Sequence, residues 1–252
     1  MYRYLAAFGI LVLFLVLSGC AALQGGVTQE PRVKTLGVLP VMVDVETIDY
    51  SAREELAALL RRGTADVDNR VVEELREKGD YFDVRLIDVP ADELLAQIVA
   101  TRVRVGDDDT AHNAYTFNPE MMTRLAGDNL VDAILVVIVN GINRPEKRWK
   151  EGRFTLDFLE AKYRSVLYWA VVVAPPAEHL WTREQPPGDV FLRLDYPDFS
   201  EAYWNATDDV KVKEITLPGL DRTLNKLEEG MTTPVLYNDM VRSLVRGLKK
   251  AM

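Results

Sequence analysis

The chain has 252 residues, of which 48% are hydrophobic and 27% are charged, and its formal net charge is −9. This composition is typical of a folded protein and excludes a disordered or collagen-like chain. The acidic balance gives no net attraction to phosphate, so we expect no nucleic-acid partner. One cysteine and two histidines are too few for the usual zinc ligand sets, so we expect no metal centre and no cofactor.

The amino terminus has the organisation of an export signal. Arg3 precedes an apolar run over residues 5–17, and the small residues Ser18 and Gly19 follow it. This run is shorter than the about 20 apolar residues that a membrane-spanning helix needs. Residues 17–20, Leu-Ser-Gly-Cys, resemble a bacterial lipobox, which implies cleavage before Cys20 and acylation of its thiol and new amino group. A plain secretory signal and an uncleaved anchor helix are the two alternatives.

Acylation of Cys20 would attach the mature chain to a membrane. Several acyl chains make a durable anchor, because each buried methylene contributes about 0.8 kcal/mol. Ala21 follows the cysteine, where an Asp would resemble an inner-membrane retention signal, so we expect the bacterial outer membrane, on its periplasmic side. Residues 20–32 are the acylated cysteine and a short tether, whose residues 21–32 extend to at most about 40 Å. The folded domain is therefore expected to stay close to its own membrane.

Predicted strands and helices alternate along the first half of the domain. In chain order they are a strand at residues 34–41, a helix at 49–79 that ends at Gly79, a strand at 82–88, a short helix that opens at Pro90, a polar surface loop at 102–117, and a helix that Asn118 and Pro119 begin. Ser51 and Glu54 are expected to form a capping box. Gly63 either splits the long helix or lets it approach the sheet closely, and we favour the close approach.

The second half begins with the most apolar segment of the mature chain. Residues 132–142 show no alternation, which predicts a central strand covered on both faces. Residues 163–173 and 179–183 predict a hairpin. Residues 186–230 have weak periodicity and form a distinctive insertion, after which Thr233 and Pro234 begin a final amphipathic helix. This order predicts a single α/β domain over residues 33–252, with a mixed sheet flanked by helices.

Five short segments carry a family resemblance. They are residues 36–40 (LGVLP), 62–66 (RGTAD), 82–84 (FDV), 130–133 (LVDA) and 180–183 (LWTR). Their order and spacing resemble the periplasmic domain shared by the curli-secretion lipoprotein, the lipoprotein activator of a penicillin-binding protein, and the amino-terminal domain of TolB. The resemblance implies a non-enzymatic protein that works by binding other proteins. The chain departs from the family at residues 174–177 (APPA), where relatives tend to have an Asp and a Thr-Gly pair.

No recognisable catalytic motif is present in the sequence. A nucleophile elbow, a phosphate loop, a dinucleotide loop and a paired-histidine metal motif are all missing, so we expect no catalytic residues and no enzyme. Asp107, Asp108 and Asp109 indicate a solvated loop, with a weak calcium site as the alternative. His112 is expected to be an exposed loop residue, with a general acid or base as the alternative, and His179 is expected to have no special role.

Two surface groups are candidates for contact with a partner. Tyr196, Phe199, Tyr203 and Trp204 either cover the hydrophobic edge of the sheet or form an exposed partner surface. The basic residues of the last helix indicate a solvated face, with contact to a protein or an acidic envelope polymer as the alternative. These residues are Arg242, Arg246, Lys249 and Lys250.

The sequence therefore predicts an outer-membrane-anchored periplasmic lipoprotein. We expect it to be a non-enzymatic protein-binding scaffold or an accessory factor in cell-envelope assembly or secretion. Its expected partners are the membrane, through acylated Cys20, and periplasmic or outer-membrane proteins, and a homo-oligomer is left open. The alternatives are a subunit of a secretion channel and an envelope-polymer hydrolase, the latter with a cleft in which His112 and several carboxylates converge.

Overall fold

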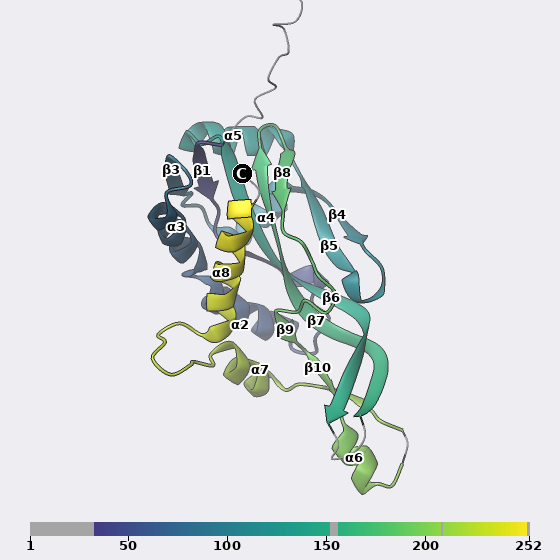
Figure 1. The fold of residues 1–252 in the computed structure, drawn as a ribbon. Helices are drawn as coiled ribbons and strands as arrows, with labels where there is room; N and C mark the ends of the chain where they lie inside the picture. Colours follow the sequence, from purple (N-terminus) through teal and green to yellow (C-terminus); the bar gives the residue numbers. More distant parts are fainter. Residues whose placement is uncertain (1–32, 152–155, 208, 251–252) are drawn as a thin grey trace, which may run out of the picture. The chain divides into compact units, whose positions relative to one another are not determined.

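The computed structural model describes residues 33–151, 156–207 and 209–250. The predicted signal peptide at 1–19 and the predicted tether at 20–32, Cys20 included, lie outside the described residues. From Val33 onward the chain forms one compact unit in which helices flank a mixed β-sheet (Figure 1). The predicted fold class, a single α/β domain with a mixed sheet, is confirmed. Within the described ranges, no helix has the length and apolar content needed to cross a bilayer.

The main sheet has the strand order β3-β1-β6-β7-β8, with β2 also paired to β6 and β9 to β7. Its strands are β1 (Thr35–Val38), β2 (Met42–Asp44), β3 (Asp83–Leu86), β6 (Ala133–Glu151), β7 (Leu156–Ala174), β8 (Glu178–Thr182) and β9 (Leu192–Arg193). Strand β1 is parallel to β3 and β6, and β2 is parallel to β6, whereas β7 is antiparallel to β6, β8 and β9. The sheet is therefore mixed, with the long β6–β7 hairpin as its centre.

Two smaller ribbons, seven α-helices and two 3-10 turns complete the fold of the described residues. The ribbons are β4 (Val99–Val105) with β5 (His112–Phe117), and β10 (Asp195–Pro197) with β11 (Val212–Glu214). The α-helices are α2 (Arg53–Thr64), α3 (Val67–Lys78), α4 (Ala91–Ile98), α5 (Pro119–Asn129), α6 (Phe199–Trp204), α7 (Leu217–Leu224) and α8 (Val235–Lys250). Short 3-10 turns, η1 (Val45–Thr47) and η2 (Asp108–Thr110), follow β2 and β4.

The central strand β6 is buried on both faces because its residues alternate between two hydrophobic clusters. Leu135, Val137 and Val139 pack into the cluster that α2, α3, α7 and α8 cover. Ile134, Val136 and Ile138 point the other way, into the cluster that α4, α5 and β5 cover. Side chains of a strand alternate between faces, so a continuous apolar run is needed when both faces are covered. The predicted central strand at residues 132–142 is confirmed.

The predicted surface loop at residues 102–117 is wrong, because this segment forms the β4–β5 hairpin. Alternate side chains of the second strand, Asn113, Tyr115 and Phe117, are buried. They pack the hairpin onto the main sheet, where the Tyr115 ring lies 5.4 Å from the Trp169 ring. The acidic run at 107–109 is confined to the turn between the strands, and its charge obscured the period-two pattern that follows it.

The predicted helix at residues 49–79 is two helices, α2 and α3, separated at Ala65 and Asp66. The expected capping box is wrong, because the Ser51 hydroxyl and backbone N–H bond to the Glu214 carboxylate and not to Glu54. Gly63 permits a close approach, but to α8 and not to the sheet. A Cβ atom at this position would lie 1.9 Å from the Tyr237 hydroxyl oxygen.

Other predicted boundaries agree with the structure. The Asn118 side chain accepts hydrogen bonds from the N–H groups of Glu120 and Met121 and so caps α5, with Pro119 as its first residue. Gly79 ends α3 with a φ of 67°, in the left-handed region that glycine adopts without strain. The final helix α8 begins directly after Pro234, as expected.

Candidate functional site

The distal half of the β6–β7 hairpin extends beyond the part of the sheet that helices cover on both faces. Strands β6 and β7 stay in register as far as residues 151 and 156, well past the predicted strand end at residue 142. Strand β6 starts beside β1, since Leu36 pairs with Ala133. At a rise of about 3.3 Å per residue, Trp149 lies roughly 50 Å further along the strand. In Figure 1 the β1 end and the α6 end of the domain lie far apart.

Buried ionic groups hold one face of this extension against residues 189–195. Arg144 is fully buried, with its Nε 3.4 Å from Glu146 and its Nη2 2.6 Å from the Asp189 carbonyl oxygen. Glu146 also accepts from Arg148, whose guanidinium lies 3.8 Å from the Tyr163 ring centre. Burial lowers the pKa of Arg148, and Glu146 opposes that effect. This network makes the extension a firm support and not a free ribbon.

A second ion pair fastens the segment that leads to α6. Asp195 is buried and accepts hydrogen bonds from the Arg164 backbone N–H at 2.8 Å, from Nε at 3.0 Å and from Nη2 at 2.6 Å. The Asp195 carboxylate therefore raises the pKa of Arg164 above its usual value. Buried charges that are paired and hydrogen-bonded fix one geometry, so β10 has a defined position on β7.

Helix α6 is short, and ion pairs with lysine connect it to the neighbouring strand β11. The Asp198 carboxylate accepts from the Glu201 backbone N–H at 2.8 Å and pairs with Lys213 at 3.0 Å, and both contacts lower the pKa of Asp198. Lys213 also pairs with Glu201 and lowers the pKa of that carboxyl. These contacts join α6 to β11 and present its aromatic residues in a fixed orientation.

The aromatic residues of α6 lie at the surface. Tyr203 and Trp204 are 72% and 80% exposed and pack edge to face, with ring centres 5.5 Å apart. Tyr196 is also exposed, and Phe199 is half-buried. The alternative that this group covers the hydrophobic edge of the sheet is therefore wrong for Tyr203 and Trp204, because their rings are in solvent.

The structure adds a second aromatic pair that the sequence did not reveal. Trp149 and Phe158 are cross-strand partners of β6 and β7, are both exposed, and have ring centres 4.9 Å apart. Lys150, the next residue of β6, points to the other face and lies 5.9 Å from the Phe199 ring and 5.8 Å from the Tyr203 ring. The two aromatic pairs therefore occupy opposite faces of one hairpin end. We call these six residues the aromatic tip: Trp149, Phe158, Tyr196, Phe199, Tyr203 and Trp204.

The residues considered for chemistry do not form one site in the described part of the chain. The Asp107 turn is closed by its own Thr110, whose hydroxyl donates to the Asp107 carbonyl oxygen at 2.7 Å. His112 Nδ1 lies 2.9 Å from the Thr110 carbonyl oxygen. His179 lies instead against Phe117 and Trp169, and burial lowers its pKa. Across the described residues, no group of three His, Cys, Asp or Glu side chains is arranged to hold a metal ion.

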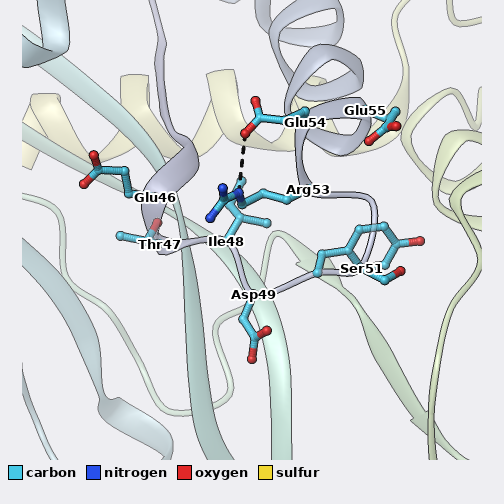
Figure 2. A pocket seen from close by; sticks show the side chains of 9 residues that line it. Glu46, Thr47, Ile48, Asp49, Ser51, Arg53, Glu54 and Glu55 are labelled. Carbon is cyan, nitrogen blue, oxygen red and sulfur yellow. Dashed lines mark ion pairs between the residues drawn. The ribbon is translucent and has the colours of Figure 1, made fainter.

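An open hollow of about 580 Å³ lies beside η1 and the start of α2 and has an acidic lining. Arg53 and Glu54 pair across 3.5 Å within it. Figure 2 shows the carboxylates of Glu46, Asp49 and Glu55 pointing in different directions. His112 does not line this hollow. The cleft that the hydrolase alternative requires, with His112 among converging carboxylates, is not formed here.

The predicted basic face of α8 is partly described. Arg242 and Arg246 are exposed, and the side chains of Lys249 and Lys250 lie outside the described residues. Arg246 lines a groove of about 420 Å³ together with Trp181, Arg183 and Ser243. Arg183 is paired with Asp189 at 2.7 Å, and its guanidinium lies 4.0 Å from the Tyr168 ring centre. Its charge is therefore used in contacts within the domain.

Comparisons with known proteins identify no family. No family model matches the chain, and no curated protein matches it. Among solved structures, the chain is similar to the hypothetical protein CT253 from Chlamydia trachomatis, with 11% sequence identity over 86% of this chain and 98% of that one and a TM-score of 0.32. The resemblance to the curli-secretion, penicillin-binding-protein activator and TolB domains stays a prediction.

Proposed function

We propose that the protein is a periplasmic adaptor, anchored to the outer membrane through acylated Cys20, that binds an envelope protein with its aromatic tip. The observation that supports this proposal most strongly is the exposure of Tyr203 and Trp204 on a rigidly supported end of the domain. Rigid aromatic side chains give a large contact area with little loss of conformational entropy, so they are enriched at the energetic centres of protein interfaces.

The position of the tip fits a tethered adaptor. Val33 directly precedes β1, and the tip lies at the other end of β6, roughly 50 Å further along the strand. A tether of at most about 40 Å would keep the β1 end near the membrane and allow the tip to project away from it. Tethering raises the effective concentration of the tip near partners of the same envelope layer.

Site-specific photo-crosslinking in cells tests this proposal. A photoreactive phenylalanine analogue at Tyr203 is expected to trap one envelope protein. The matched control places the same analogue at Phe82, a 91% exposed aromatic residue beside β1 at the other end of the domain. The adduct from Tyr203 should disappear when Trp204→Ala is added, and it should weaken when Cys20→Ser removes the anchor. Identical adducts from Tyr203 and Phe82 would contradict the role of the tip.

The two alternatives have less support from the described residues. A secretion-channel subunit stays a prediction that no observation here tests. A hydrolase of an envelope polymer lacks the converging carboxylates and histidine that its chemistry requires. The adaptor is therefore the function that the geometry supports best.

A further inference from the structure

The end of the domain opposite the aromatic tip also exposes large apolar side chains. Among the described residues, four such side chains are more than two-thirds exposed. Tyr203 and Trp204 belong to the tip, whereas Phe82 and Leu130 are 91% and 75% exposed at the β1 end. Phe82 directly precedes β3, and Leu130 directly follows α5 (Figure 1). The contacts proposed for the tip involve neither of these two residues.

The register of the sheet places Phe82 and Leu130 on one edge. Strand β1 is parallel to both β3 and β6, so all three strands start at the same edge. The Phe82 N–H donates to the Lys34 carbonyl oxygen at 2.9 Å, and the Asp132 N–H donates to that of Thr35 at 2.9 Å. Two strand spacings separate β3 from β6, so the backbones of Phe82 and Leu130 lie about 10 Å apart. The chain enters the domain between them, at the start of β1.

Arg85 ties the two sides of this edge together. Its Nε donates to the Asp83 carboxylate at 2.7 Å, beside Phe82. Its Nη1 donates to the carbonyl oxygens of Asn129 at 2.9 Å and Leu130 at 3.3 Å. The guanidinium therefore fixes the end of α5 against β3, and the two exposed apolar residues keep a defined spacing.

Leu130 has a backbone conformation that leucine rarely adopts. It ends α5 with a φ of 53°, and its N–H donates to the Gly127 carbonyl oxygen at 3.2 Å. Glycine is the usual residue at such a helix end, because a Cβ atom destabilises the left-handed region. The Leu130 side chain is 75% exposed, so packing inside the domain does not explain why a leucine is here. Strain of this kind at a surface position indicates a contact outside the domain.

The charges around this edge are of both signs. Lys34 and Lys78 are exposed, and so are Asp80 and Asp128. A surface with this balance neither strongly attracts nor strongly repels a neutral partner, and it gives no preference for an anionic one. The edge is therefore suited to a zwitterionic lipid surface, with apolar contact as the source of affinity.

We propose that Phe82 and Leu130 insert into the interfacial layer of the bilayer that holds acylated Cys20, so that the β1 end of the domain rests on the lipid. This proposal rests on the anchor of the proposed function. Residues 21–32 span at most about 40 Å, and the chain that follows them enters the domain between the two exposed side chains. Apolar side chains bind a membrane interface in proportion to the apolar area that they bury there.

Two side chains give a small contact area, which suits a chain that is already tethered. The anchor makes the contact intramolecular, and the short tether gives a high effective concentration of lipid at this edge. A contact too weak to recruit a free protein is then populated. Its effect is orientation, because it would hold the aromatic tip roughly 50 Å from the lipid surface, at the other end of β6.

Photo-crosslinking to lipid tests the contact. The acylated, full-length mature chain is placed in phosphatidylcholine vesicles with a photoreactive phenylalanine analogue at Phe82, and lipid adducts are measured by mass spectrometry. Two exposed positions serve as controls: Tyr203 at the tip, and Asp88, six residues or about 20 Å further along the chain from Phe82. A domain that tumbles freely on its tether would give similar adduct yields at Phe82 and Asp88. We expect the yield at Phe82 to be at least about fivefold higher than at either control, because only an inserted side chain meets acyl chains.

Leu130→Gly separates membrane contact from folding. Glycine adopts the φ of 53° without strain, so the melting temperature should not fall. The lipid adduct from the analogue at Phe82 should nevertheless drop at least about threefold, because half of the inserted apolar surface is lost. Leu227→Gly is the matched control, since Leu227 is a 53% exposed leucine between α7 and α8, and it should leave the adduct unchanged.

The outcomes distinguish this proposal from the function of the tip. Equal lipid adducts at Phe82 and Asp88, or an adduct that Leu130→Gly does not reduce, would overturn the membrane contact alone. An unmodified Cys20 in the mass of the amino-terminal peptide would overturn the anchor and this proposal together. Neither result changes the protein adduct expected from Tyr203, which reports on the tip.

Discussion

Glu146 is expected to be the single carboxylate on which the support of the aromatic tip depends most. It is buried and lies between two guanidinium groups, 3.4 Å from Arg144 and 3.1 Å from Arg148. Glu146→Gln keeps the size of the side chain but removes its charge, and it leaves fully buried Arg144 with two carbonyl oxygens as its partners, those of Ala111 and Asp189. Removing one member of a buried ion pair costs about 3–5 kcal/mol, because the remaining charge is uncompensated.

Urea denaturation, monitored by tryptophan fluorescence, measures this loss. The free energy of unfolding should be lower, while its dependence on urea concentration (the m-value) stays unchanged. For a domain of this size, the same loss lowers the melting temperature by roughly 6–20 °C. The matched control is Glu160→Gln on the exposed face of the same hairpin. Glu160 pairs with Lys147 at 3.4 Å, and both side chains are more than half exposed. We expect the control to change stability by less than about 1 kcal/mol.

Hydrogen exchange locates the effect of Glu146→Gln. Arg144 joins β6 to Asp189, so amides of residues 189–198 should lose protection before the central part of β6 does. Equal stability of the Glu146→Gln and Glu160→Gln variants would refute the reasoning, since it would show that the buried pair does not hold the tip.

Substitutions at Gly63, Asn118 and His179 test three further points, the first two with a matched control. Gly63→Ala should lower the free energy of unfolding by about 1–3 kcal/mol in a urea titration, because its Cβ would overlap the Tyr237 hydroxyl. Gly127→Ala is the control: this position in α5 has open space around it, so the free energy of unfolding should rise by about 0.5–1 kcal/mol. Asn118→Ala should cost about 1 kcal/mol, because α5 loses its cap, and Asn118→Asp should restore most of this in thermal melts. Contact with Phe117 and Trp169 partly desolvates the otherwise exposed His179 ring and lowers its pKa, so stability should fall slightly as pH falls below about 6.5, the usual value for histidine. His179→Gln should remove this small part of the pH dependence, and an unchanged slope would contradict the reasoning.

Elements with local chemical signals were predictable from the sequence. Asn118 and Pro119 marked the start of α5, Gly79 marked the end of α3, and the uninterrupted apolar run of β6 marked the centre of the sheet. Each of these signals depends on a residue that performs one local task, such as capping a helix. The covering of both faces of β6 follows from the same apolar run, whereas the strand order did not follow from any local signal.

Elements whose burial depends on distant partners were not predictable. The distal part of β6 contains Arg144 and Glu146, which look solvated in the sequence and are buried only because residues 189–195 cover them. The sequence showed Tyr203 and Trp204 as part of an aromatic group. Their exposure, however, depends on the position of α6 beside the end of the β6–β7 hairpin, which the sequence does not indicate. Trp149 and Phe158 gave no signal in the sequence, because they are far from any motif and only the register of β6 with β7 brings their rings together.

The most direct test of the account is the affinity of the purified chain for the envelope protein that Tyr203 traps. If the aromatic tip is the binding surface, Trp204→Ala should weaken binding by at least 2 kcal/mol, or about 30-fold in dissociation constant, because exposed aromatic anchors dominate such interfaces. Phe82→Ala, at the other end of the domain, should leave the constant unchanged. Equal dissociation constants for the Trp204→Ala variant and the unaltered chain would contradict the proposed function.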